Sequence, residues 1–187
     1  MDNKVKIGLM IGGGVVLATI AAVLLFSKKS AGKLIEEAKK YVGQQEIYND
    51  QGFYDKAFEK KMATAGWAKG LQWCALFVRM VFLQCAKGKA LEFFRSKLNA
   101  SANGSFQNIK AAGKNDYAEL IPKPEAGCLV CYVHHIEFCE SVNGDKMTVI
   151  SGNSSLGSGK HGVSRTQRTI SKPFEELNGY IRIKKID

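Results

Sequence analysis

The most informative segment of the sequence is Gly66–Phe82, which reads GWAKGLQWCALFVRMVF. Its first half carries two glycines and its second half is almost entirely apolar, so the pattern predicts a loop followed by a buried helix. Cys74 falls in the first turn of that helix, close to the positive end of the helix dipole, which favours the nucleophilic thiolate. Cys74 is therefore a candidate nucleophile, and a small buried core residue is the alternative.

The pattern of the chain changes near residue 120. Before that point apolar residues recur at helical spacing, and after it short alternating or β-rich runs predict strands. The predicted helices cover residues 31–42, 55–65, 73–85 and 91–98, and the predicted strands cover residues 128–133, 135–142, 147–150, 163–170 and 180–186. Helices followed by meandering strands predict an α+β fold, in which N-terminal helices pack on an antiparallel sheet around one core.

Two predicted strands carry candidate partners for Cys74. A cysteine nucleophile needs a base within hydrogen-bond reach and a third group that orients the base. The turn signal Asn143-Gly144-Asp145 joins the strands, which places His135 beside Asn153 across the hairpin. The adjacent His134 points to the opposite face by strand alternation, and His161 lies in a predicted Gly/Ser loop over residues 152–162. The pattern predicts a relay of Cys74, His135 and Asn153.

The N-terminus carries a run of 20 uncharged residues, Ile7–Phe26, with lysines on both sides. About 20 such residues at ~1.5 Å each span the ~30 Å hydrocarbon core, so we expect a transmembrane helix within residues 1–29 and one catalytic domain over residues 30–187. A cleaved signal peptide is the alternative, although its apolar core is normally only ~7–15 residues long. Gly8-x3-Gly12 would allow two such helices to pack as a homo-oligomer.

Composition and charge limit the partners. The chain has 187 residues, 45% of them hydrophobic, which suits one folded domain, and its net charge of +10 suits a polyanion such as nucleic acid, anionic lipid or cell-wall polymer. Nucleic acid is not expected, because the basic residues are scattered and form no Arg-rich stripe. Five cysteines are an odd number, so at least one thiol is free or pairs between chains.

Several of these motifs together resemble the CHAP and NlpC/P60 group of papain-like cysteine peptidases and amidases, which cleave peptidoglycan. The resemblance covers roughly residues 34–183 and implies a papain-like fold with Cys74 as nucleophile, His135 as base and Asn153 as orienting residue. The motifs that carry it are Trp73–Val78, Gly127–Val130, His135–Val142, Val149–Asn153, Gly162–Arg165 and Gly179–Arg182.

The sequence departs from the family pattern at three positions. Cys128 stands where the family usually has Asp, and Glu137 stands where it usually has Gly. Ser151 occupies a position at which many members carry Glu as an additional polar partner. The last departure leaves Asn153 as the only evident orienting residue.

A zinc site is a rival interpretation, because Cys128-x2-Cys131-x2-His134 with Cys139 nearby offers suitable ligands. On an extended strand, however, residues 128 and 131 point to opposite faces. A calcium loop at Asn49–Asp55 lacks the acidic ligand at the twelfth position, and helix capping by Asp55 is preferred. We therefore expect no metal and no cofactor.

The expected function is a membrane-anchored peptidoglycan hydrolase that cleaves an amide bond, either muramoyl-L-alanine or a stem or cross-bridge peptide bond. The expected location is a single-pass membrane protein whose catalytic domain faces the cell wall, in a bacterial envelope, a phage or a membrane-containing virion. The lysines that follow Phe26 outnumber those before Ile7, which argues for the opposite orientation. The alternative function is a catalytically inactive wall-binding protein on the same fold.

Overall fold

The computed structural model describes residues 28–187, which form an α+β fold. After a helical segment at residues 28–39 come the helices α2 (Lys56–Thr64), α3 (Cys74–Cys85), α4 (Gly88–Lys97) and α5 (Ala102–Ala111). The strands are β1 (Glu46–Ile47), β2 (Gly52–Phe53), β3 (Ala118–Ile121), β4 (Leu129–Tyr132), β5 (Ile136–Asn143), β6 (Lys146–Gly157), β7 (Lys160–Thr169) and β8 (Leu177–Ile183).

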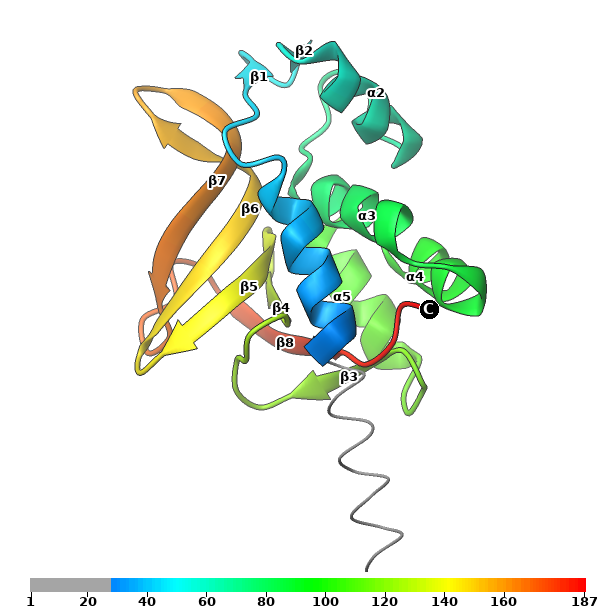
Figure 1. Cartoon of the computed structure of the whole chain (residues 1–187). Coiled ribbons are helices and arrows are strands. Elements are labelled where there is room, and N and C mark those ends of the chain that lie inside the picture. The colour runs from blue at the N-terminus through cyan, green and yellow to red at the C-terminus, as the bar shows by residue number, and fades with distance from the viewer. Residues whose placement is uncertain (1–27) are drawn as a thin grey trace, which may run out of the picture.

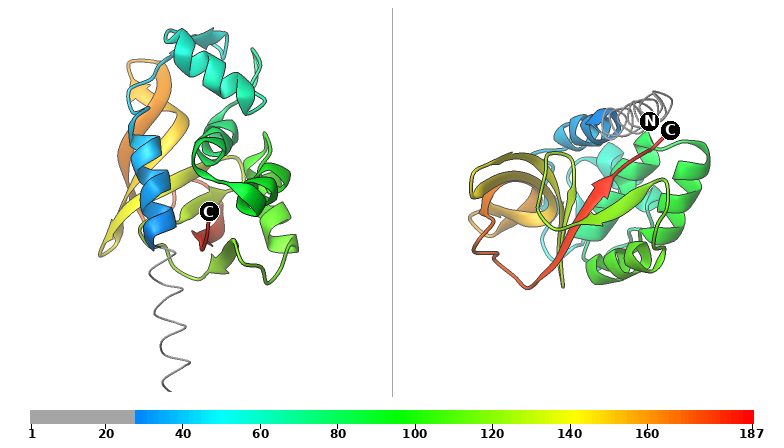
Figure 2. Two further views of the ribbon diagram at one scale, coloured as in Figure 1. Left: turned by 45° about the vertical axis from the view of Figure 1, so that its right-hand side comes forward. Right: turned by 90° about the horizontal axis from the view of Figure 1, so that it is seen from below.

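The strands form two antiparallel sheets. β1 pairs with β2, and the other six strands form one sheet in the order β3-β8-β4-β5-β6-β7. Figure 1 shows the curved strands β5, β6 and β7 on one side of the molecule and α3, α4 and α5 on the other, and Figure 2 shows the same layers from two more directions. α3 packs directly on β5 and β6, so its first turn is positioned by the centre of the sheet.

The core lies between α3 and the sheet. Trp73, Phe77 and Phe82 on the helical side and Phe138 and Ile150 on the strand side are all fully buried. Phe77 and Phe138 meet edge to face with ring centroids 6.2 Å apart, an arrangement that adds to the gain from burying both rings. α3, the helix predicted over residues 73–85, is therefore the element on which the rest of the fold packs.

The predicted elements agree with the structure except in four places, the first of which is the pair of short strands β1 and β2, for which no strand was predicted. The sequence analysis missed α5, whose Gly104 and polar residues weaken the helical pattern, and the short strand β3. It also assigned residues 152–162 to a loop, whereas β6 and β7 continue to Gly157 and Lys160 as a paired hairpin. Backbone hydrogen bonds hold this hairpin, and they do not depend on apolar side chains.

The structure corrects the prediction of a membrane-spanning helix and, with it, the predicted membrane localisation. Among residues 28–187 no helix has both the length and the apolar composition needed to cross a bilayer. α3, the most apolar of the labelled helices, has 12 residues, which extend ~18 Å against a hydrocarbon core of ~30 Å. Residues 7–26, to which the spanning helix, the lipid contact and the homo-oligomer were assigned, lie outside the described residues.

Candidate functional site

The first turn of α3 is held in place by two close contacts. Trp73, directly before the helix, is fully buried, and its indole N–H donates a hydrogen bond to Glu46 Oε2 at 2.6 Å. β6 approaches so closely that a Cβ atom on Gly152 would lie 2.5 Å from Phe77 Cβ. Cys74, the first residue of α3, is therefore fixed between the β1 segment and the centre of the sheet.

The Cys74 thiol lies against the backbone on both sides of His135. Its Sγ is 3.7 Å from the carbonyl oxygen of His134, and the backbone N–H of Ile136 reaches the same sulfur. Cys74 is 6% exposed, and this burial raises the pKa of its thiol in spite of the N–H groups of Ile136, Ala75 and Cys74 itself. Burial thus outweighs the helix N-terminus, contrary to the sequence-based expectation of a readily formed thiolate.

The His135 side chain is 12% exposed and faces Glu137, with 3.6 Å between His135 Nε2 and Glu137 Oε2. Its ring also lies near Tyr132 and Phe174, with centroid distances of 6.5 and 5.8 Å. Burial lowers the pKa of His135, although the charges of Glu137 and Glu175 oppose this effect. The thiol and the imidazole are therefore both favoured in their neutral forms.

Glu175 connects these two groups electrostatically. Its Oε1 accepts a hydrogen bond from the backbone N–H of His134, the residue whose carbonyl contacts the thiol. The negative charge of Glu175 raises the pKa of Cys74 and also that of His135. The charge of Glu175 therefore acts on both the nucleophile and the base predicted from the sequence, whereas the His134 side chain is exposed to solvent.

Glu137 is the centre of a buried polar cluster on the same side of the sheet as His135. Its side chain is fully buried and accepts hydrogen bonds from three side chains, namely Tyr132 Oη at 3.2 Å, Arg168 Nε and Nη2 at 3.3 Å each, and Ser151 Oγ. The Arg168 guanidinium in turn lies 4.1 Å from the centroid of the Phe174 ring. A buried carboxylate is costly unless it is paired and hydrogen-bonded, and this cluster supplies both.

Asn153 does not orient His135 in this structure. The ladder between β6 and β7 shifts register between Ser151 and Ser154, and Asn153 takes a left-handed conformation with φ of 51° at this bulge. Within residues 28–187 no hydrogen bond joins Asn153 to His135. The structure thus brings Cys74 to the His135 segment and turns Asn153 elsewhere, because a bulge breaks the regular alternation that the prediction assumed.

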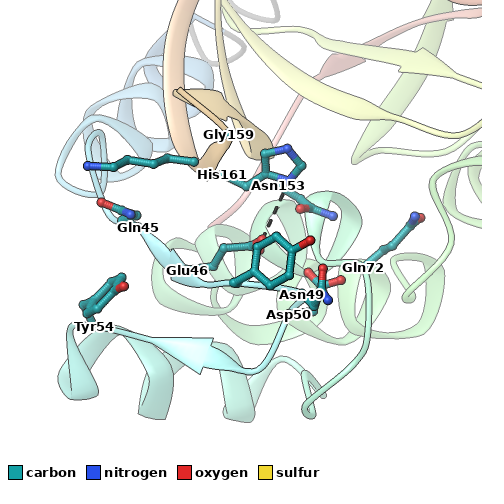
Figure 3. A pocket seen from close by; sticks show the side chains of 11 residues that line it. Gln45, Glu46, Asn49, Asp50, Tyr54, Gln72, Asn153, Gly159 and His161 are labelled. Atoms are coloured by element: carbon teal, nitrogen blue, oxygen red, sulfur yellow. Dashed lines mark ion pairs between the residues drawn. The ribbon is translucent and has the colours of Figure 1, made fainter. Parts of the chain in front are cut away.

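Asn153 instead lines a cavity of about 660 Å³ beside the first turn of α3, which we call the Glu46 pocket. Figure 3 shows its walls, which come from the β1–β2 segment, the β6–β7 hairpin and Gln72. His161 Nδ1 lies 3.7 Å from Glu46 Oε1, and the charge of Glu46 helps burial to raise the pKa of the neighbouring Asp50 to about 6. The exposed rings of Tyr48 and Tyr54 line the same pocket.

The proposed zinc ligands are divided between two faces of the sheet. Cys131 packs in the core with α3, whereas Cys128 and Cys139 lie in the second apolar cluster with Val130 and Tyr132. Within residues 28–187 no three His, Cys, Asp or Glu side chains are arranged to hold a metal ion.

Two acidic residues of the site were not identified from the sequence. Glu137 stands between Ile136 and Phe138 in a run otherwise suited to a buried strand, and such an isolated charge is the signal that indicates it. Glu46 gives no comparable signal, because its contact with Trp73 joins residues 27 positions apart.

Comparisons with known proteins show no family for this chain. No family model matches it, and no curated protein matches it. Among solved structures, the chain is similar to the crystal structure of Ly7917, with a TM-score of 0.43 and 14% sequence identity. The match covers 82% of this chain and 62% of the other, and a likeness at this level carries no argument about function.

Proposed function

We propose that the protein is a cysteine-dependent hydrolase that cleaves an amide bond of peptidoglycan, with Cys74 as nucleophile and His135 as base. The observation that carries the proposal is the placement of the Cys74 thiol, at the start of α3, against the backbone that flanks His135. A thiol and an imidazole held by adjacent rigid elements are the two groups that amide cleavage through a thioester requires.

The reaction begins from the neutral pair. Because His135 Nε2 faces Glu137, Nδ1 is the nitrogen left for the thiol proton. As Sγ of Cys74 bonds to the carbonyl carbon, its proton passes to Nδ1, and the carbonyl oxygen becomes an oxyanion near the backbone N–H of Cys74. The imidazolium then protonates the leaving amine, and the C–N bond breaks to give a thioester. Water activated by Nδ1 hydrolyses the thioester and restores the thiol.

The choice of peptidoglycan rests on charge, on the pocket and on the sequence resemblance. Only Lys4, Lys6 and Asp2 precede residue 27 among the charged residues, so almost all of the net charge of +10 belongs to the rest of the chain. A basic surface attracts an anionic wall polymer. The Glu46 pocket, which reaches Gln72 two residues before the nucleophile, offers space for the substrate strand.

A catalytically inactive wall-binding protein is the second candidate. It is favoured by the burial of Cys74, which raises the pKa of the thiol, since structural thiols are buried and inert.

The test is the incubation of the full chain with purified peptidoglycan sacculi, followed by mass spectrometry of the released fragments. The matched variants are Cys74→Ala and Cys85→Ala, which remove thiols at opposite ends of α3. The proposal predicts new amino groups in the fragments from the parent and from Cys85→Ala, and none from Cys74→Ala. Sedimentation of the parent with intact sacculi without cleavage would favour the inactive candidate.

A further inference from the structure

Burial of the Glu137 carboxylate costs free energy, and an apolar side chain at this position would fill the sheet without that cost. β5 runs through the centre of the sheet, and the neighbours of Glu137 in sequence, Ile136 and Phe138, are fully buried apolar residues. The carboxylate is retained at 0% exposure by three hydrogen-bonding side chains, each from a different strand of the same sheet. Replacement of such a cluster by apolar residues is often neutral or stabilising, so stability alone does not account for the buried carboxylate.

The side chain next to this carboxylate that still has an unsatisfied polar atom is His135. Its Nε2 is buried with no hydrogen-bond partner and lies 3.6 Å from Glu137 Oε2. A small rotation of the ring brings these atoms to hydrogen-bond distance, and an ionised carboxylate only accepts, so it selects the tautomer with hydrogen on Nε2. The Phe174 ring lies beside both His135 and Arg168.

The pairing of β5 with β6 explains why the carboxylate can come from residue 137. Phe138 is directly opposite Ile150, which makes Ser151 the next residue opposite Glu137. The Ser151 hydroxyl donates a hydrogen bond to Glu137 Oε2, so both side chains occupy one space on one face of the sheet. A carboxylate attached to either strand at this level would reach the same place beside His135.

We propose that Glu137 is the positioning residue for His135, and that it fixes the Nε2–H tautomer so that Nδ1 is free to take the thiol proton. The inference rests on the proposed function for its consequence in catalysis, but the tautomer itself does not depend on any substrate. Asn153, in contrast, has no part in holding the ring. The cluster of Tyr132, Ser151 and Arg168 serves to keep Glu137 in place.

The first test is NMR of the histidine rings in the full chain labelled with ¹⁵N-histidine, which contains only three histidines. The variant is Glu137→Gln, and the control is Glu140→Gln, a carboxylate of the same strand paired with Arg165 and Lys39. The charged or titratable groups that face His135 are Glu137, Arg168, Glu175 and Tyr132, and the Cys74 thiol lies at the carbonyl oxygen of the preceding residue, His134.

We expect the parent and Glu140→Gln to show the Nε2–H tautomer of His135. Loss of the anion removes a stabilising partner of the imidazolium, so the His135 pKa should fall in Glu137→Gln by about one pH unit. Its tautomers should also become mixed. Equal titration curves and equal tautomer populations in Glu137→Gln and Glu140→Gln would overturn the proposal.

The second test exchanges the two residues across the strands. Glu137→Ser alone should lower kcat on peptidoglycan about 10- to 100-fold with little change in KM, because orientation of the base is lost. The double variant Glu137→Ser with Ser151→Glu keeps the composition and returns a carboxylate to the same space, so it should recover most of the loss and the Nε2–H tautomer. A double variant that is folded but no better than the single one in both readouts contradicts the proposal.

The two tests separate this inference from the proposed function. A parent protein that does not cleave peptidoglycan, but whose His135 tautomer changes in Glu137→Gln, would refute the hydrolase and leave the positioning role intact. A parent protein that cleaves peptidoglycan, but whose His135 tautomer is unchanged in Glu137→Gln, would refute the positioning role and leave the hydrolase intact. If Glu137→Gln fails to fold, the exchange variant, judged by its His135 tautomer, decides the question.

Discussion

The Glu46 pocket contains a pair of acidic residues whose charge should make the stability of the protein depend on pH. Burial and the charge of Glu46 raise the pKa of Asp50 from its usual value of 3.8 to about 6. The folded state therefore holds this proton more tightly than the unfolded state does. The corresponding stabilisation is complete below pH 3.8 and is lost as the pH rises to about 6.

Glu46→Gln removes one charge of the pair and keeps an oxygen that accepts the hydrogen bond from Trp73. The rise in the pKa of Asp50 from 3.8 to about 6 corresponds to ~3 kcal/mol. Burial accounts for the largest part of this free energy, and solvent screening reduces the part that comes from the charge of Glu46. We therefore expect Glu46→Gln to increase the free energy of unfolding by about 1 kcal/mol at pH 7.5, and by much less at pH 4. Urea unfolding of the full chain at both pH values measures this difference.

Glu59→Gln is a control with the opposite sign. The pKa of Glu59 is lowered, first by the backbone N–H of Phe53 and then by Lys56, so its charge stabilises the fold above its usual pKa. Neutralising it should reduce stability at pH 7.5. The reasoning is refuted if Glu46→Gln gains no more stability at pH 7.5 than at pH 4, or if the two variants change stability in the same direction.

Three further substitutions and one control test how the residues around the site are held. Gly152→Ala should cost ~1–3 kcal/mol in urea unfolding, because its Cβ has no room against α3, whereas Gly32→Ala, with open space around it in a helix, should gain up to ~1 kcal/mol. Asp55→Ala should cost ~1 kcal/mol by the same measurement, because its side chain caps α2 at the N–H groups of the first turn. Asn153→Ala should raise KM on peptidoglycan through the Glu46 pocket and leave the NMR titration of His135 unchanged; a change in that titration would restore Asn153 as the orienting residue.

The positions of Cys74 and His135 could be predicted because each depends on a local pattern. The apolar run after Trp73 determines where α3 begins, and the turn at Asn143-Gly144-Asp145 determines how β5 and β6 pair. Both patterns extend over a few residues. α3 and β5 form within one residue of the predicted limits, whereas β6 continues seven residues beyond its predicted end at residue 150. The sequence therefore indicates which residues meet at the start of α3.

The partner of His135 could not be predicted, because it depends on a bulge and on contacts between strands. Strict alternation would place Asn153 opposite His135, but the register shift after Ser151 turns Asn153 into the Glu46 pocket. Glu137, which we propose as the positioning residue of His135, is held in place by Arg168 from β7, which is 31 residues away along the chain. The pKa of Cys74 was mispredicted for a similar reason, since burial by distant residues outweighs the local helix dipole.

The most direct test of a covalent mechanism is detection of the thioester at Cys74. The full chain is mixed with soluble peptidoglycan fragments, quenched in acid within milliseconds to seconds, digested and analysed by mass spectrometry. The account predicts a fragment attached through Cys74 in the parent, no attachment in Cys74→Ala, and a strongly reduced amount in His135→Ala but not in His134→Ala. Cleavage of the fragments with no adduct at Cys74, or an adduct that forms equally well without His135, would contradict it.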